Sequence, residues 1–154
     1  SKHLTFKNGT FSDMKTFMTG ELFELLSTKS ILSNSVINSP FSEKAFFEGV
    51  AAGLKESVNA SLFSVRAKHI LENSHKEENF HYLSGLLIGD ELSYLQNTSE
   101  SISLCGSEPV FGLYKTALLS FLNPEKLFFF DDDELQKAVL KGHRKIINLA
   151  LGGK

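Results

Sequence analysis

The stretch SISLCGSEPVFGLYKTALLSFLNPEKLFFF, residues 101–130, predicts the fold class of this chain. SISLC indicates a short strand, and Pro109 suits the first turn of the helix that follows. Leu127–Phe130 is a short apolar strand. Between these two strands, apolar residues recur at helical spacing: Val110, Leu113, Tyr114, Ala117, Leu118 and Phe121. A strand–helix–strand unit implies parallel pairing, and therefore an α/β protein whose sheet is covered by helices.

Towards the end of the chain, Asp131, Asp132 and Asp133 begin a last helix. Negative charge suits a helix N-terminus, and three consecutive side chains do not point the same way, so capping is preferred to a metal site. The basic residues of this helix fit a solvated face rather than a nucleic-acid site. They are Lys137, Lys141, His143, Arg144 and Lys145.

Towards the start of the chain, residues 3–7 alternate between polar and apolar, as a half-buried strand does. Asn8-Gly9 is the strongest short signal for a hairpin turn, and residues 10–18 form the predicted return strand. Thr19 is a candidate N-cap of the first helix, with Glu21 near the positive end of its dipole.

Helices dominate the middle of the chain. They are predicted over residues 42–55, 62–71 and 77–95, and residues 30–40 form a polar loop. Gly85 and Gly89, four residues apart, predict close packing between helices. A hairpin, a set of inserted helices and a strand–helix–strand–helix run resemble one half of a ribonuclease-H-like fold that lacks its first strand. We expect the hairpin and the two later strands to share one sheet.

This topology predicts where a ligand binds, because ligands of open α/β sheets bind beyond the carboxyl ends of the parallel strands. Three segments are expected at that edge: Ser1-Lys2, Thr19-Gly20-Glu21 and Gly106-Ser107. The Asn8-Gly9 turn is expected at the opposite edge. Two of the three segments open helices, whose free N–H groups favour anions.

Composition excludes several classes of protein. The 154 residues are the size of one domain, with 42% hydrophobic residues and a formal net charge of -2, so neither a disordered chain nor a nucleic-acid-binding protein is indicated. No apolar run has the length of a membrane span, and residues 1–9 hold no signal peptide. Cys105, the single cysteine, is expected to be a buried small hydrophobe, and a cytoplasmic setting follows. The five histidines do not have the spacing of metal ligands. The sequence does not decide whether the chain forms a homo-oligomer.

Five stretches, in this order and spacing, resemble the 2-dehydro-3-deoxygalactonokinase family. They are MKTFMTGELFELLSTKSIL (14–32), FEGVAAGL (47–54), LFSVRAKHIL (62–71), YLSGLLIGDEL (82–92) and LCGSEPVFGLYKTAL (104–118). The resemblance implies the C-terminal lobe, residues 1–154, of a two-lobe sugar-acid kinase of the actin-like group. In that family the second lobe opens with a Gly-Thr-His-Ser-Lys turn that resembles a phosphate-binding loop. Ser1-Lys2 looks like the end of this turn, and the N-terminal lobe is absent.

The resemblance implies ATP and Mg²⁺ as cofactors and phosphorylation of the 6-hydroxyl of 2-dehydro-3-deoxy-D-galactonate. Ser1, Lys2, Gly106 and Ser107 are then expected to bind nucleotide, and Thr19, Gly20 and Glu21 are candidates for the cleft. No catalytic base is assigned in this chain, and the chain alone is expected to be inactive. A non-catalytic nucleotide- or protein-binding domain of the same fold is the alternative.

From the residues alone, some of these assignments stay open. Gly106-Ser107 fits a plain strand-to-helix turn as well as it fits a nucleotide-binding turn. The family resemblance favours nucleotide binding. Glu21 fits a helix-dipole carboxylate, which we prefer to a polar role at the cleft. Phe128, Phe129 and Phe130 are expected to form a buried strand.

Overall fold

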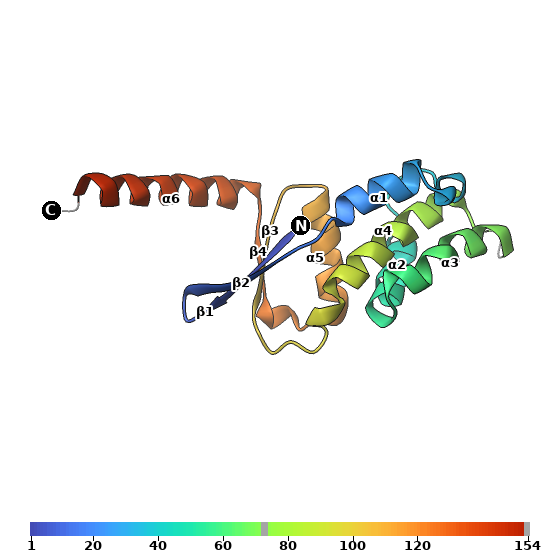
Figure 1. The fold of residues 1–154 in the computed structure, drawn as a ribbon, viewed down its shortest axis with the longest axis horizontal. Helices are drawn as coiled ribbons and strands as arrows, with labels where there is room; N and C mark the ends of the chain where they lie inside the picture. The colour runs from blue at the N-terminus through green and yellow to red at the C-terminus, as the bar shows by residue number, and fades with distance from the viewer. Residues whose placement is uncertain (72–73, 153–154) are drawn as a thin grey trace. The chain divides into compact units, whose positions relative to one another are not determined.

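The computed structural model describes residues 1–71 and 74–152 (Figure 1). The chain divides into two compact units, Ser1–Asn97 and Thr98–Lys154. The first unit contains β1 (Lys2–Lys7), β2 (Thr10–Thr16), α1 (Thr19–Thr28), η1 (Ile31–Ser35), α2 (Glu43–Lys55), α3 (Val58–Leu71), α4 (Lys76–Leu92) and η2 (Ser93–Leu95). The second contains β3 (Ile102–Cys105), α5 (Val110–Phe121), η3 (Pro124–Lys126), β4 (Leu127–Phe130) and α6 (Asp132–Gly152).

The predicted hairpin is present. β1 and β2 pair antiparallel, and the turn residues Asn8 and Gly9 have φ of 50° and 75°, the left-handed values that this tight turn needs. β2 is shorter than predicted, because Met18 has left the extended conformation (ψ 30°) and caps α1. The prediction that Thr19 is the N-cap is therefore wrong, since Thr19 is the first helical residue and its hydroxyl bonds elsewhere.

Helices α2 and α4 pack with their backbones almost in contact. A Cβ added to Gly85 would lie 2.1 Å from the carbonyl oxygen of Phe46, and a Cβ added to Gly89 would lie 2.4 Å from that of Val50. The glycines of α2 meet the backbone of α4 in the same way: Gly49 and Gly53. The prediction of close packing is confirmed, and glycine is required here because any side chain would collide with backbone.

The core of the first unit lies where α4 meets α3 and η1. It is built from buried apolar side chains: Leu32, Val36, Val65, Tyr82, Leu83, Leu86 and Leu87. The buried side chain of Asn79 crosses this core, and its amide nitrogen donates to the carbonyl oxygens of Ser35 and Val65, each at 3.1 Å. Residues 31–35, predicted as loop, form the 3-10 helix η1 because Leu32 packs into the core and Asn79 satisfies the backbone at Ser35.

In the second unit, β3 and β4 pair in parallel, with Ile102 opposite Leu127 and Cys105 opposite Phe130. The predicted strand–helix–strand unit is confirmed. The prediction that these strands share a sheet with the hairpin is wrong: within residues 1–71 and 74–152, each strand pair hydrogen-bonds only inside its own unit, which gives two two-stranded sheets.

Burial of β4 is only partial. Phe129 packs edge-on against Phe111 of α5, with ring centroids 6.4 Å apart. Phe128 and Phe130 point to the opposite face and are 49% and 37% exposed, because successive strand residues alternate between faces. The prediction of a buried strand is wrong for these two residues. Cys105 is also exposed, contrary to prediction, since it ends a strand of a two-stranded sheet.

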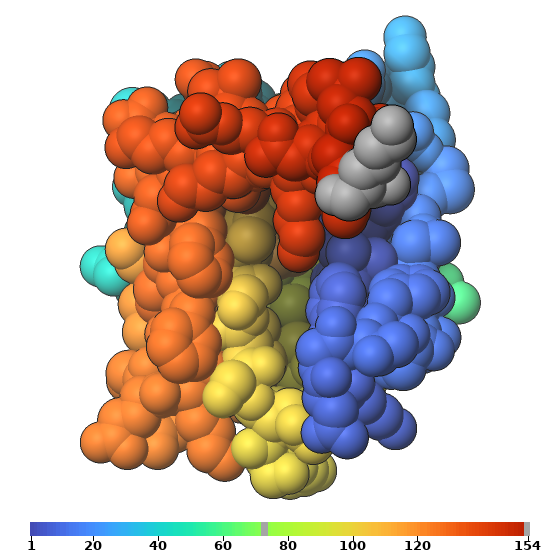
Figure 2. Space-filling view, turned by 90° about the vertical axis from the view of Figure 1, so that its left-hand side faces the viewer, coloured from blue at the N-terminus to red at the C-terminus, as the bar shows by residue number. Residues whose placement is uncertain are grey.

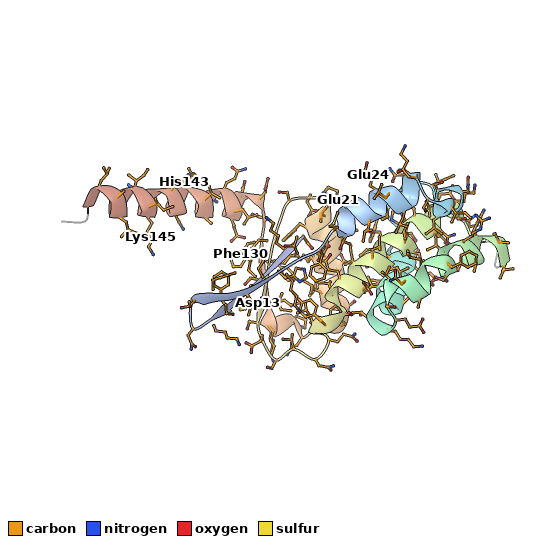
Figure 3. All side chains as sticks on the ribbon, viewed as in Figure 1. Asp13, Glu21, Glu24, Phe130, His143 and Lys145 are labelled. Carbon is orange, nitrogen blue, oxygen red and sulfur yellow. The ribbon has the colours of Figure 1, made fainter. Side chains whose placement is uncertain are left out.

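Helix α6 begins with a reciprocal cap. The backbone N–H of Glu134 donates to Asp131 Oδ1 at 3.1 Å, and the backbone N–H of Asp131 donates to Glu134 Oε2 at 3.3 Å. The capping interpretation of the aspartate run is confirmed. Helix α6 has the red end of the colour range in Figure 2. Its basic side chains, His143 and Lys145 among them, are exposed (Figure 3), as the solvated-face interpretation predicts.

Candidate functional site

The open end of the hairpin brings two of the predicted segments together. The backbone N–H of Phe17 donates to the carbonyl oxygen of Ser1 at 3.0 Å, and the backbone nitrogen of Ser1 donates to the carbonyl oxygen of Phe17 at 2.9 Å. This pair continues the ladder of β1 and β2 by one step beyond Lys2 and Thr16. Ser1 therefore lies at the same end as the start of α1, and the Asn8-Gly9 turn lies at the other end, as predicted.

A buried carboxylate of α4 connects these two segments. The side chain of Glu91 is 1% exposed. Its Oε1 accepts hydrogen bonds from the hydroxyl of Ser1 and lies 2.7 Å from Nε2 of His3. Its Oε2 accepts a hydrogen bond from the hydroxyl of Thr19. One carboxylate thus contacts β1, the residue before it and the first residue of α1. We call Ser1, His3, Thr19 and Glu91 the Glu91 cluster.

Aromatic side chains border the cluster on one side. The hydroxyl of Tyr94 lies 2.6 Å from Nδ1 of His3, and the ring of Phe17 stacks on that of Tyr94 with centroids 6.3 Å apart. The ammonium of Lys15 lies 3.8 Å from the centroid of the Tyr94 ring. Partial burial raises the pKa of the Tyr94 phenol, and the carboxylates of Glu91 and Asp13 raise it further. The neutral phenol can therefore donate to His3, which orients the imidazole towards Glu91.

Lys2, Gly20 and Glu21 are exposed at the same end of the hairpin. Glu21 lies in the first turn of α1 (Figure 3), where a carboxylate interacts favourably with the helix dipole. A Cβ added to Gly20 would meet nothing within 4 Å, and Gly20 does not have positive φ. The fold therefore does not require glycine at residue 20.

The third predicted segment lies in the second unit, after β3. Gly106 and Ser107 follow the carboxyl end of β3, and Asp132 follows the carboxyl end of its parallel neighbour β4. The hydroxyl of Ser107 donates to Asp132 Oδ1 at 2.7 Å, so the two strand ends are joined. This is the edge at which open α/β sheets bind ligands.

Gly106 also has no structural need to be glycine. A Cβ at this position would lie 3.8 Å from Cβ of Phe111, an ordinary contact, and its φ is not positive. A plain strand-to-helix turn would accept alanine here. Cys105, next to Gly106, is exposed, but desolvation and then the Glu134 carboxylate raise the pKa of its thiol, so less of it is thiolate near neutral pH than for an ordinary thiol.

Sequence reasoning missed Glu91, His3, Tyr94 and Asp132. One signal could have found Glu91: it follows Leu83 and Leu87 at four-residue spacing, so a carboxylate continues a buried apolar stripe. Across residues 1–71 and 74–152, no three His, Cys, Asp or Glu side chains gather as they would around a metal ion. No helix among the described residues is long and apolar enough to cross a bilayer.

Comparison with known proteins gives consistent matches. The family model described as 2-keto-3-deoxy-galactonokinase matches residues 1–140. The 2-dehydro-3-deoxygalactonokinase of Escherichia coli (strain K12) is 37% identical over 87 residues, which are 56% of this chain and 30% of that protein. A protein of Rhizobium meliloti (strain 1021), named as a probable 2-dehydro-3-deoxygalactonokinase, DgoK1, is 34% identical over 128 residues, 78% of this chain and 42% of that protein.

The fold matches as well. The crystal structure of a Sinorhizobium meliloti protein with a provisional 2-dehydro-3-deoxygalactonokinase assignment superposes with a TM-score of 0.81 at 31% identity. The match covers 95% of this chain and 49% of that one. The chain spans less than half the length of each of these three relatives.

Proposed function

Because the chain belongs to the 2-keto-3-deoxy-galactonokinase family, we propose that it is the C-terminal, ribonuclease-H-like lobe of a two-lobe sugar-acid kinase. The proposed reaction transfers the γ-phosphate of ATP to the 6-hydroxyl of 2-dehydro-3-deoxy-D-galactonate. The names of the relatives support the substrate, and the match to less than half of each relative supports the assignment to one lobe. A cytoplasmic setting is part of the same proposal.

Two glycines at which the fold would accept a side chain support the site assignment. Gly20 is the second residue of α1 and Gly106 directly follows β3, and neither crowding nor positive φ explains why they lack a side chain. Close approach of a ligand to the backbone does explain it. We therefore propose that Gly106 and Ser107 lie against adenosine.

Phosphoryl transfer is mostly positioning and charge neutralisation. Within the first unit, taken by itself, Ser1, Lys2 and residues 19–21 are proposed to bind phosphate. Lys2 provides an ammonium at the open end of the hairpin, next to Ser1, whose hydroxyl donates to Glu91. The first turn of α1, residues 19–21, adds N–H groups that lack intrahelical partners, at the positive end of the helix dipole. These groups bind and orient an anion, and they do not remove a proton from the sugar acid.

Within residues 1–71 and 74–152, no group of three or more His, Cys, Asp or Glu side chains is placed to hold a metal ion, and we propose no magnesium site there. Mg²⁺ takes oxygen ligands, usually one or two carboxylates together with substrate phosphates. Both oxygens of Glu91 already accept hydrogen bonds from hydroxyl groups, and the described residues hold no cluster of potential ligands. We expect Mg²⁺ on the phosphates of ATP and on groups outside residues 1–154.

The test is a turnover assay on two proteins, the full-length protein that contains this lobe and the isolated chain. We expect ADP release that depends on 2-dehydro-3-deoxy-D-galactonate from the full-length protein only. Isothermal titration of ATP into the isolated chain is the companion measurement. Turnover by the isolated chain at a rate near that of the full-length protein would refute the lobe assignment. ATP binding without turnover in both proteins would favour a non-catalytic nucleotide-binding domain.

A further inference from the structure

We propose that Glu91 is a positioning residue that fixes the distance between the two segments at the open end of the hairpin. This inference rests on the proposed function, because those segments carry the groups proposed to hold phosphate. The two carboxylate oxygens are divided between the segments: Oε1 accepts from Ser1, and Oε2 accepts from Thr19. The carboxylate therefore joins the residue before β1 to the first residue of α1.

The burial of Glu91 is the first argument for a specific role. A carboxylate at 1% exposure is unfavourable unless its oxygens accept hydrogen bonds. One and two turns earlier on the same face of α4, Leu87 and Leu83 are 4% and 0% exposed. An apolar residue at position 91 would continue this packing without the cost of burying charge. Packing gives no reason for a charged residue at this position. Accepting hydrogen bonds from the hydroxyls of Ser1 and Thr19 does give one.

The geometry of the neighbours is the second argument. His3 lies between Glu91 and Tyr94, at 2.7 Å from Glu91 Oε1 and 2.6 Å from the Tyr94 hydroxyl. The Phe17 ring, 4.6 Å from the His3 ring, belongs to the segment that leads into α1. The carboxylate is therefore held from both segments and cannot rotate without breaking contacts to one of them.

The decisive variant is Glu91→Gln in the full-length protein. Glutamine keeps the shape and one acceptor oxygen, but its NH₂ group donates and cannot accept from a hydroxyl. Either Ser1 or Thr19 then loses its acceptor. We expect kcat/KM for ATP to fall by about tenfold or more, the size expected from losing a charged hydrogen bond at the site. We also expect faster hydrogen exchange in a peptide covering residues 14–22, because the backbone N–H of Phe17 is bonded to Ser1.

Asp90→Asn is the matched control. Asp90 precedes Glu91 on α4, and its Oδ1 accepts from the backbone N–H of Val58 at 2.9 Å, at the start of α3. Asparagine keeps an acceptor oxygen, so the change removes the charge and weakens this bond without abolishing it, at a place away from the hairpin. We expect a lower melting temperature for Asp90→Asn, with kcat/KM for ATP per folded molecule and exchange in residues 14–22 both unchanged.

A second pair of variants covers the case in which Glu91→Gln does not fold. Thr19→Val removes one donor and should reproduce the loss in kcat/KM and the faster exchange, whereas Thr19→Ser keeps the hydroxyl and should restore both. Hydrogen exchange does not depend on kinase activity, so it decides the positioning role even if the full-length protein shows no turnover with ATP. Unchanged exchange in residues 14–22 for both Glu91→Gln and Thr19→Val would overturn the proposal. An equal loss of kcat/KM in Asp90→Asn and Glu91→Gln would also overturn the proposal.

Discussion

Alanine in place of Gly85 should destabilise the first unit, although alanine is the better helix former. The added Cβ would lie 2.1 Å from the carbonyl oxygen of Phe46 and 2.9 Å from the backbone nitrogen of Val50. Both neighbours are backbone atoms of α2, so no side chain can rotate away. To reach an ordinary contact of 3.4 Å, the helices would have to separate by about 1.3 Å at this point.

The magnitude follows from two opposing terms. Replacing a helical glycine by alanine contributes about 0.5–1 kcal/mol of stability through propensity. Overpacking a close interface costs about 1–3 kcal/mol, and separation also opens gaps around Phe46 and Val50, which are 0% and 1% exposed. The unfavourable term wins, and we expect a net loss of about 1–2 kcal/mol in the free energy of unfolding. That is a large share of the about 5–15 kcal/mol that holds an ordinary domain together.

Urea unfolding followed by far-ultraviolet circular dichroism measures this loss, since the chain has no Trp to serve as a fluorescent probe. Gly20→Ala is the control within the same unit, because its Cβ would meet nothing within 4 Å. We expect Gly20→Ala to be neutral or slightly stabilising. Equal or greater stability of Gly85→Ala would refute the argument, and so would an equal loss in both variants.

Two further predictions concern the site. Gly106→Val in the full-length protein should raise the KM for ATP roughly ten- to a hundredfold, the equivalent of about 1–3 kcal/mol, because a branched side chain would stand between backbone and nucleotide. Since a Cβ at Gly106 would meet Phe111 only at 3.8 Å, the melting temperature should change little; a lowered melting temperature with an unchanged KM would remove Gly106 from the site. The Tyr94 phenol should ionise above its ordinary pKa of 10.0, so the tyrosinate absorbance that Tyr94→Phe removes should develop above pH 10. Because the folded-state pKa is raised, the stability linked to the neutral phenol is present below pH 10 and is lost as the pH rises through the folded-state pKa; a midpoint at or below pH 10 would contradict this.

Local patterns predicted most elements of the fold. Asn8-Gly9 gave the hairpin because only left-handed residues close that turn, and the apolar spacing after Pro109 gave α5 because a helix repeats every 3.6 residues. Errors arose where a distant contact decides a local choice. Thr19 has the side chain of a good N-cap, but its hydroxyl donates a hydrogen bond to Glu91, which is 72 residues away.

Burial in the second unit was less predictable from sequence. An apolar run such as Phe128–Phe130 indicates a strand covered on both faces, but periodicity does not reveal how many strands the sheet has. In a two-stranded sheet, Phe129 packs on α5 while its neighbours face away. The Glu91 cluster escaped prediction for a related reason: its members come from β1 and the residue before it, from α1 and from α4, and only the tertiary fold brings them together.

The glycine contacts and the Glu91 cluster are parts of one arrangement. Glu91 can hold Ser1 and Thr19 only if α4 itself is fixed, because a hydrogen bond tolerates only a few tenths of an ångström around its preferred length. Gly89, two residues before Glu91, presses directly on the backbone of α2 at Val50. Because backbone contacts backbone here, no flexible side chain can move aside to let α4 slide along α2. The inserted helices therefore provide a rigid support from which a single buried carboxylate reaches the end of the hairpin.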